Sequence, residues 1–190
     1  MQHEIRIDGF AFALRPVTAG DAERIVELRT NPRLSRYLHP VSPDVSLQRE
    51  WIRTYFSRPG DYYFAVERRG HETAEGFAGI YDLDPESRRA EWGRWVLAPG
   101  SLAAVESALL VYRAAFEMLE LDEVYCRTVA ENGSAVSFHD SCGLVRSDRT
   151  GFFELSGVRF DFIEHRLARG EWPEVKARLS GLAIRIAGRL

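Results

Sequence analysis

The sequence contains little lysine or cysteine. Lys176 is its only lysine, so almost all of its 25 basic residues are arginines. Its two cysteines, Cys126 and Cys142, have no histidine cluster beside them. Two cysteines are too few for a disulfide framework and give only weak support to a metal site. We therefore expect two buried, reduced thiols and no metal.

Long apolar runs and a strong net charge are also absent. No segment reaches the ~20 apolar residues that a membrane-spanning helix needs. Glu4, Arg6 and Asp8 interrupt the first apolar residues, unlike a secretory signal. The net charge is only −3, whereas broad nucleic-acid binding needs many basic groups against the phosphates. These features predict a cytoplasmic protein with no nucleic-acid partner.

The composition that remains is that of an ordinary globular protein, with 45% apolar and 28% charged residues. A chain of 190 residues can bury one substantial core. No repeat or low-complexity segment divides it. We place one domain at residues 1–168 and a C-terminal helical extension at residues 169–190.

Hydrophobic periodicity, capping residues and turns predict the order of the secondary-structure elements. Thr18 or Asp21 could cap the first helix, and Ser46 would open the second. The predicted elements, in order, are a strand at 10–14, helices at about 21–30 and 46–55, strands at 62–68, 76–83 and 90–97, a long helix from 101 to about 119, a strand at 123–130, a helix at 133–142, and strands at 144–154 and 157–167.

Two short segments suggest a binding site. Asn132 follows a run typical of a buried strand, precedes a short helical pattern, and could cap that helix. Gly143 stands where a helix C-terminus favours a residue with positive φ. Gly100 and Ser101 precede the long helix, whose free N–H groups would favour an anion. A capping signal of this kind is common, so the second segment alone leaves a purely structural role open.

The strand-Asn-helix-Gly unit and the loop before the long helix resemble the GNAT superfamily of N-acetyltransferases. The resemblance covers residues 10–168 and includes the order of the elements. It implies an α/β (mixed α+β) GNAT fold, with a central mixed, mostly antiparallel, twisted sheet flanked by helices. It also implies acetyl-CoA as the cosubstrate. The chain has His139 at the family's usual tyrosine position and Leu144 at its usual phenylalanine, and its loop keeps only Gly100.

The resemblance further implies which residues hold acetyl-CoA. Backbone groups late in the strand 90–97 would polarise the thioester carbonyl, and the following loop would bind the pyrophosphate. The side chain of Asn132 would bond the pantetheine chain. The expected residues are Trp95, Val96, Leu97, Gly100, Ser101, Leu102, Ala103, Asn132, Ser134 and Phe138.

Two residues are candidates for proton transfer. Glu91 is placed by the resemblance as a base acting through water on the acceptor amine, which is largely protonated at neutral pH. The structural alternative is a solvated Glu91 at the end of the strand, or a Glu91 paired with Arg88 or Arg89. His139 would protonate the leaving thiolate or stabilise it with its N–H. A structural histidine on the helix is the alternative for His139.

The acceptor site is expected between the loop after the first helix and the third strand. Its candidate residues are Arg33, Arg36, His39, Tyr81 and Asp82. Arginine forks suit phosphate oxygens. Glu91-Trp92-Gly93 and Phe138-His139 look most like acetyltransferases of nucleotide-linked amino sugars, including the pseudaminic-acid pathway type. This implies direct transfer in a ternary complex. The alternatives are a ribosomal-protein type of N-terminal acetyltransferase and an inactive CoA-binding module.

The last residues form an apolar stripe at helical spacing, made by Val175, Leu179, Leu182, Ile186 and Leu190. A helix with such a stripe must pack somewhere or lie on a membrane surface. We favour packing on the domain or on a second subunit, which would make a homodimer.

Overall fold

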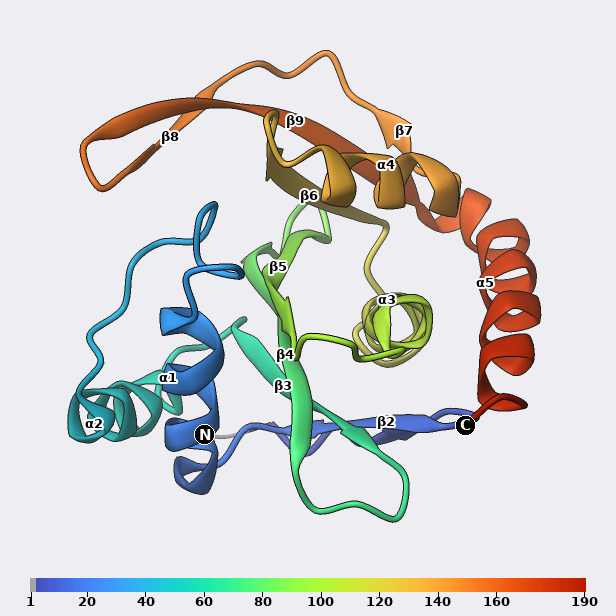
Figure 1. The fold of residues 1–190 in the computed structure, drawn as a ribbon. Helices are drawn as coiled ribbons and strands as arrows, with labels where there is room; N and C mark the ends of the chain where they lie inside the picture. Colours follow the sequence, from blue (N-terminus) through green and yellow to red (C-terminus); the bar gives the residue numbers. More distant parts are fainter. Residues whose placement is uncertain (1–2) are drawn as a thin grey trace.

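The computed structural model describes residues 3–190. Within this range, nine strands form a sheet that separates two groups of helices (Figure 1). The strands are β1 (Ile7–Asp8), β2 (Phe12–Pro16), β3 (Tyr62–Arg68), β4 (Ala74–Asp84), β5 (Arg89–Leu97), β6 (Glu123–Val129), β7 (Val145–Arg146), β8 (Phe152–Leu155) and β9 (Val158–Ala168). The helices are α1 (Ala22–Thr30), α2 (Val45–Tyr55), α3 (Ala104–Arg113), α4 (Gly133–Cys142) and α5 (Trp172–Ala187).

The strand order is β1-β2-β3-β4-β5-β6-β9-β7, with β8 paired to β9. Every pair is antiparallel except β5 and β6, which are parallel. Their pairing lasts only from Arg89 opposite Glu123 to Glu91 opposite Tyr125. Beyond Glu91 the two strands separate, which leaves one edge of β5 without a neighbouring strand. The predicted mixed, mostly antiparallel sheet is confirmed.

Two hydrophobic cores cover the two faces of the sheet. The helices α1 and α2 pack on one face, where Ile25, Leu28 and Ile52 join residues of β3 and β4. The helices α3 and α5 pack on the other, together with the end of α4 (Figure 1). Both cysteines are buried in this second core, as predicted. No helix in residues 3–190 is both long and apolar enough to cross a membrane.

Helix boundaries were predicted best where a capping residue is local. The helix α4 begins and ends as predicted, because Asn132 accepts a hydrogen bond from the Ala135 N–H and Gly143 has φ of 89°. The prediction that α2 begins at Ser46 was wrong by one residue, because the helix begins at Val45. Asp44 is the N-cap, and its carboxylate accepts from the Ser46 N–H at 2.8 Å.

The long helix predicted from residue 101 to 119 is interrupted. Regular α-helix begins at Ala104 and ends at Arg113, and a π-helical turn, Ala114–Met118, follows. Of the apolar stripe predicted for this helix, Leu109, Tyr112 and Phe116 are buried in the core, while Leu102 at its start is exposed. Periodicity was therefore right about the buried face but could not detect the change in hydrogen-bonding pattern. The prediction of one strand at 144–154 was also wrong, because β7 and β8 are separate and pair with different parts of β9.

The C-terminal helix is part of the core rather than an appendage. Trp172, Val175, Leu179 and Ala183 are buried in the core beside α3, and Trp172 donates to the Glu117 carboxylate at 3.1 Å. The predicted stripe was correct at its first two positions only. It continues through Ala183, while Leu190 is exposed. Packing on the domain is thus the observed arrangement for α5.

Candidate active site

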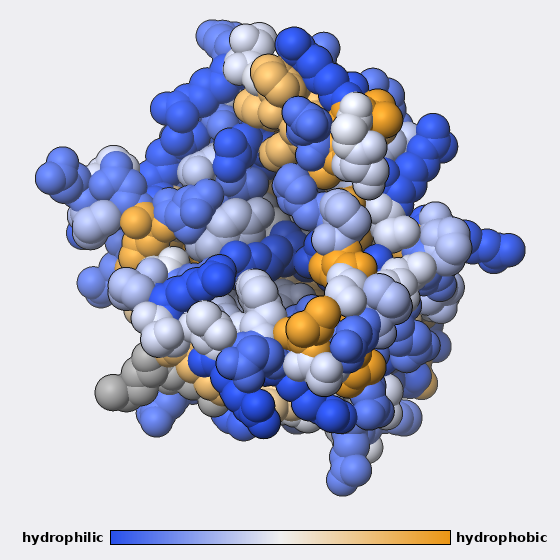
Figure 2. Space-filling view, turned by 90° about the vertical axis from the view of Figure 1, so that its left-hand side faces the viewer, coloured by the Kyte–Doolittle hydropathy of each residue, from blue (hydrophilic) through white to orange (hydrophobic). Residues whose placement is uncertain are grey.

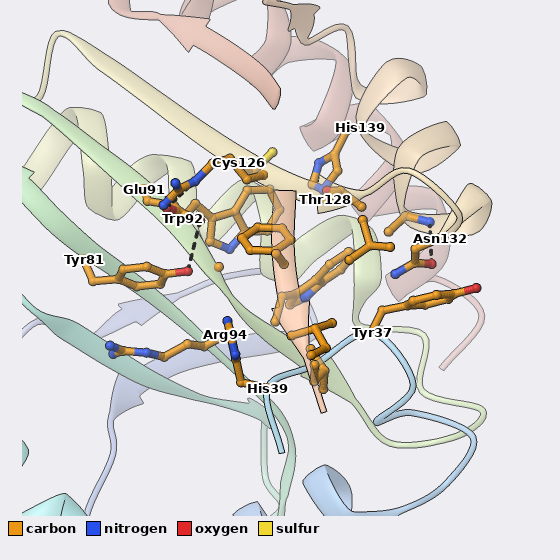
Figure 3. A pocket seen from close by; sticks show the side chains of 18 of the residues that line it. Tyr37, His39, Tyr81, Glu91, Trp92, Arg94, Cys126, Thr128, Asn132 and His139 are labelled. Atoms are coloured by element: carbon orange, nitrogen blue, oxygen red, sulfur yellow. Dashed lines mark hydrogen bonds and ion pairs between the residues drawn. The ribbon is translucent and has the colours of Figure 1, made fainter. Parts of the chain in front are cut away.

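A cavity of about 440 Å³ opens where β5 and β6 separate. Figure 2 looks onto the face that carries α1 and α2 and shows a hollow near its centre. The loop after α1 and the β8–β9 hairpin meet above the cavity, where the rings of Tyr37 and Phe160 lie 6.0 Å apart and those of His39 and Phe153 lie 6.1 Å apart. Side chains from both strands, from α4 and from the loop therefore point into one space (Figure 3).

A β-bulge in β5 shapes the wall of this cavity. Gly93 is opposite Gly79, but Val96 is opposite Phe77, so β5 contains one extra residue. Arg94 occupies the bulge with φ of 52°. Its guanidinium bonds both carboxylate oxygens of Asp61, at 2.5 and 2.9 Å, and lies 4.4 Å from the centre of the Tyr81 ring. The bulge thus turns a charged side chain toward the cavity and fixes Tyr81 beside it.

Glu91 is a buried carboxylate held by two donors. It is 4% exposed, and it accepts from the Tyr81 hydroxyl at 3.2 Å and from the Arg127 Nε at 2.9 Å. Burial raises the pKa of Glu91, while Arg127 and Tyr81 act against this rise. The pKa of Tyr81 is also raised, mainly by burial, so its hydroxyl stays protonated and donates. The cluster can keep a negative charge in a partly dehydrated cavity and order a water beside it.

His139 projects from α4 into the opposite part of the cavity (Figure 3). It is 4% exposed, and its ring packs edge-on against Trp92 at 5.2 Å and against Phe138 at 5.6 Å. Burial, followed by the neighbouring His165, lowers the pKa of His139 to about 3. The imidazole is therefore neutral at physiological pH. It can donate or accept a hydrogen bond, but it does not rest as an imidazolium ready to protonate a thiolate.

Asn132 lies where the sequence analysis predicted, at the start of α4 and beside the expected binding site. Its side chain caps α4 and it also lines the cavity. Ser134 is exposed and donates to the Asn132 side-chain oxygen at 3.0 Å. Phe138 packs at a tilt against Trp95 with 4.8 Å between ring centres, and the Trp95 Nε1 donates to Ser107 on α3. These contacts build an apolar floor between the separated strands, where an extended pantetheine chain would fit.

The loop before α3 combines a glycine of positive φ with a helix N-terminus, as an anion site requires, but the Glu75 carboxylate lies beside it. Gly100 has φ of 81° and open space above it. Ser101 accepts from the Ala103 N–H at 3.1 Å and donates to the Glu75 carboxylate at 2.5 Å. Ala103 is fully buried in the core, so its small side chain serves packing, and only its backbone faces the loop.

The predicted site residues fall into two groups. Those that line the cavity are Glu91, His139, Trp95, Asn132, His39, Tyr81 and Asp82. The others are not part of its lining. Val96 is buried in the core under α1 and α2, Leu97 is partly buried in the core under α3, and Leu102 is exposed. The remaining residues outside the lining are Gly100, Ser101, Ala103, Ser134, Phe138, Arg33 and Arg36. Arg33 and Arg36 are exposed on the loop after α1, where the Arg36 guanidinium lies over the Tyr37 ring.

The sequence did not point to several residues of the cavity, above all Arg127, Arg94 and Arg29. Arg127 is two positions beyond the last residue of β6 that pairs with β5, and its partner Glu91 is 36 positions away in the chain. Only the parallel register could have linked them. Among residues 3–190, no three His, Cys, Asp or Glu side chains gather where they could hold a metal ion.

Comparisons with known proteins agree with this geometry. The family model for the acetyltransferase (GNAT) domain matches residues 12–145. YdaF of Bacillus subtilis (strain 168), provisionally named a ribosomal N-acetyltransferase, is 26% identical over 174 residues, which cover 84% of this chain and 92% of YdaF.

Two solved structures extend the comparison. FdhC, a nucleotide-linked sugar GNAT in its apo form, has a TM-score of 0.79 and 29% identity, over 93% of this chain and 97% of FdhC. The spermidine N-acetyltransferase of Vibrio cholerae in complex with CoA and spermine has a TM-score of 0.77 and 20% identity, over 87% of this chain and 99% of that one. Because the sequence identity to this second structure is only 20%, the likeness shows a shared fold and nothing more. The family match over most of the chain, the confirmed sheet and the cavity between β5 and β6 together show that the protein belongs to the GNAT acetyltransferases and is an N-acetyltransferase.

Proposed function

We propose that the protein acetylates the amine of a nucleotide-linked amino sugar by direct transfer from acetyl-CoA. Three arginines are the main support: one lines the cavity, and two are exposed on the loop after α1. Arg29 lies in the last turn of α1, and Arg33 and Arg36 follow on the loop. None of the three has a carboxylate within ion-pair distance in residues 3–190, and the Nε of Arg29 is buried without a hydrogen-bond partner. Guanidinium groups without anionic partners suit an acceptor that carries a diphosphate.

The acids of the cavity argue against a polyamine acceptor. Asp82 and Glu91 are the two acidic residues in its lining, and both face Arg127, which lies 3.9 Å from the Asp82 carboxylate. A polycation would need free carboxylates, whereas here the negative charges are already compensated. The likeness to FdhC, a nucleotide-linked sugar GNAT, agrees with this choice.

The proton transfers can be assigned to the chain's own residues. When bound, acetyl-CoA supplies the acetyl group and the leaving thiolate. Glu91 would take the first proton of the acceptor ammonium through a water, with Arg127 and Tyr81 keeping the carboxylate ionised and in place. Asn132 and the loop at Gly100 and Ser101 would hold the cosubstrate. Contacts between the arginines and the remote diphosphate would orient the amine.

The second candidate is acetylation of protein N-termini, which the relative YdaF suggests. A thiol-release assay across UDP- and dTDP-amino sugars, the free amino sugars, spermidine and N-terminal peptides separates the candidates. We expect the nucleotide-linked sugars to be much better substrates than the free sugars. Comparable rates for both sugars, or a preference for peptides, would overturn the proposal.

Variants of the arginines test whether these side chains bind the diphosphate of the acceptor. Arg33→Ala and Arg36→Ala should each lower kcat/KM for the nucleotide-linked sugar by about ten- to hundredfold, since a charge-assisted hydrogen bond contributes ~1.5–3 kcal/mol. Turnover of the free sugar should change little. Arg53→Ala is the matched control, because Arg53 is an exposed arginine on α2. An equal loss of kcat/KM for both sugars would show that the arginines do not bind the diphosphate.

A further inference from the structure

A second cavity, of about 350 Å³, adjoins the active-site cavity. It lies between α1, α2 and the loop 39–42, and residues of β3 and β5 also line it. Arg29, His39 and Arg94 belong to the lining of both cavities. Figure 3 shows Arg94 and His39 on the side of the active-site cavity that is far from His139. A ligand that extends past these three side chains would therefore occupy both cavities at once.

The junction between the two cavities carries an uncompensated positive charge. Arg94 is neutralised by Asp61, which accepts two hydrogen bonds from it. Arg29 has no carboxylate partner in residues 3–190; it donates to the His39 carbonyl oxygen at 2.7 Å, and its Nε is without a partner. Burial raises the pKa of Tyr63, and Arg29 and then Arg94 oppose this rise, so both cations lie near one ring. An anion at the junction would be stabilised by Arg29 without displacing an existing carboxylate.

The rest of the second cavity suits a flat ring. Its lining within residues 3–190 contains no acidic side chain. Ile25, Val41 and Leu47 give it apolar sides, and Leu47 is 57% exposed. Trp51 also lines it and is fixed by Tyr55, whose ring lies parallel at 5.6 Å between centres. Apolar sides and a rigid aromatic side chain favour contact with the face of a heteroaromatic base.

One polar side chain of the second cavity is free to bond the edge of such a ring. Gln48 lies on α2, lines the cavity and is half-buried. Within the part of the chain that the structure describes, its side-chain amide forms no hydrogen bond. A primary amide offers donors and an acceptor side by side. The edge of a nucleobase presents an acceptor beside a donor in the same way, so the two can pair through two bonds.

We propose that the second cavity is the nucleoside subsite of the acceptor. The base lies against Leu47 and Trp51 and bonds Gln48, while Arg29 holds the diphosphate between the two cavities. The sugar amine then lies in the active-site cavity beside Glu91. This inference rests on the proposed function and deepens it, because it assigns the far end of the nucleotide-linked sugar. Contacts with the base are the same before and during acetyl transfer, so they add affinity rather than turnover.

The subsite can be tested by binding alone, without acetyl transfer. We would titrate the full chain with UDP, dTDP, ADP and inorganic pyrophosphate in a calorimeter. We expect at least one nucleotide to bind tenfold or more tightly than pyrophosphate, because only a nucleotide fills the second cavity. Gln48→Leu should weaken nucleotide binding by about tenfold, as expected for lost hydrogen bonds, and leave pyrophosphate binding unchanged. Leu47→Ala should weaken nucleotide binding by a few-fold through lost apolar contact.

Glu50→Leu is the matched control for Gln48→Leu. Glu50 has the size of Gln48 and lies on the same helix, but it is exposed and pairs with Arg53 outside the cavity. It should leave nucleotide binding unchanged. Gln48 and Leu47 are both at least partly exposed, so their replacement should not prevent folding. Pyrophosphate binding as tight as that of every nucleotide, or equal nucleotide affinities in the wild type and Gln48→Leu, would overturn the proposal.

Kinetics separate this inference from the function beneath it. Gln48→Leu should raise KM for the nucleotide-linked sugar about tenfold, while kcat and the turnover of the free sugar stay within about twofold. If the wild type and Gln48→Leu acetylate nucleotide-linked sugars equally well, the subsite is wrong and the proposed function stands. If nucleotides bind through Gln48 but no nucleotide-linked sugar is acetylated, the proposed acceptor is wrong while the nucleotide-binding subsite stands.

Discussion

Two clusters of titratable groups face the cavity, and burial moves the pKa values of Glu91 and His139, one in each cluster, in opposite directions. The carboxylate cluster consists of Glu91, Tyr81 and Arg127, and the imidazole cluster consists of His139, His165 and Asp140. Glu91 and His139 are equally buried, at 4% exposure each. Burial disfavours the charged form of both, so it raises the pKa of Glu91 and lowers the pKa of His139.

The difference lies in the nearest opposite charge. Arg127 bonds the Glu91 carboxylate directly and opposes the effect of burial. The carboxylate nearest to His139 is Asp140, with His165 between them. The comparison teaches that one cavity can keep a base ionised and an imidazole neutral, with the distance to one counter-charge deciding the state of each.

Removing the carboxylate from the first cluster should have the largest effect. Glu91→Gln keeps the size of the side chain and its bond from Tyr81 but cannot take a proton. We expect kcat to fall by ~10²–10⁴-fold, with little change in KM for acetyl-CoA, in a steady-state thiol-release assay. Glu67→Gln is the control, because Glu67 is paired with Arg15 outside the cavity. A kcat within threefold of the wild type would assign the amine's first proton to another group.

A methyl group at Gly93 should disturb the same cluster more mildly. A Cβ at this position would overlap the Tyr81 hydroxyl oxygen, so the hydroxyl would have to leave Glu91. We expect kcat to fall by about ten- to hundredfold, which corresponds to one lost hydrogen bond to a charged group. Gly170→Ala is the matched control, since a Cβ there meets nothing within 4 Å. Equal activities for the two variants would show that Tyr81 does not hold Glu91 in its working position.

The imidazole cluster should reveal itself in acid stability. His139 has a folded-state pKa of about 3, below its unfolded value of ~6.5. As the pH falls below ~6.5, the unfolded chain binds a proton that the folded chain refuses, so stability is lost down to about pH 3. The loss approaches ~1.4 kcal/mol for each pH unit.

His139→Phe should therefore flatten the dependence of the melting temperature on pH between 7 and 5. His71→Phe is the control, because His71 is exposed in a turn after β3. The same slope for the wild type and His139→Phe would mean that His139 takes up its proton in the folded protein.

The smallest expected effect concerns the loop before α3, which belongs to neither cluster. The Glu75 carboxylate bonds Ser101 where the pyrophosphate is proposed to bind. Glu75→Gln removes that negative charge and should tighten CoA binding by a few-fold, since the site is half-exposed and salt screens it. The measurement is the rise in melting temperature with CoA, which reaches ~2.7 kcal/mol of stabilisation at a hundred times the dissociation constant. Weaker binding in Glu75→Gln would show that Glu75 orders the loop for CoA.

The sequence by itself determined the parts of the protein that depend on neighbouring residues. The helix α4 was predicted to its last residue because Asn132 and Gly143 act on backbone groups within one turn. The strand β3 was also predicted in full, since its pattern ends at turns on both sides. Family resemblance added the fold, the position of Glu91 and the position of His139.

Only the tertiary structure decided how these residues work. The three-residue parallel register of β5 and β6 places Arg127 beside Glu91, and the pairing of β9 with β6 and β7 places His165 behind His139. These contacts join residues that are far apart in the chain, so no local pattern encodes them. Burial has the same origin: the packing of α3, α4 and the sheet removes water from both groups, which raises the pKa of Glu91 and lowers the pKa of His139, and the direct contact of Arg127 then opposes the shift at Glu91.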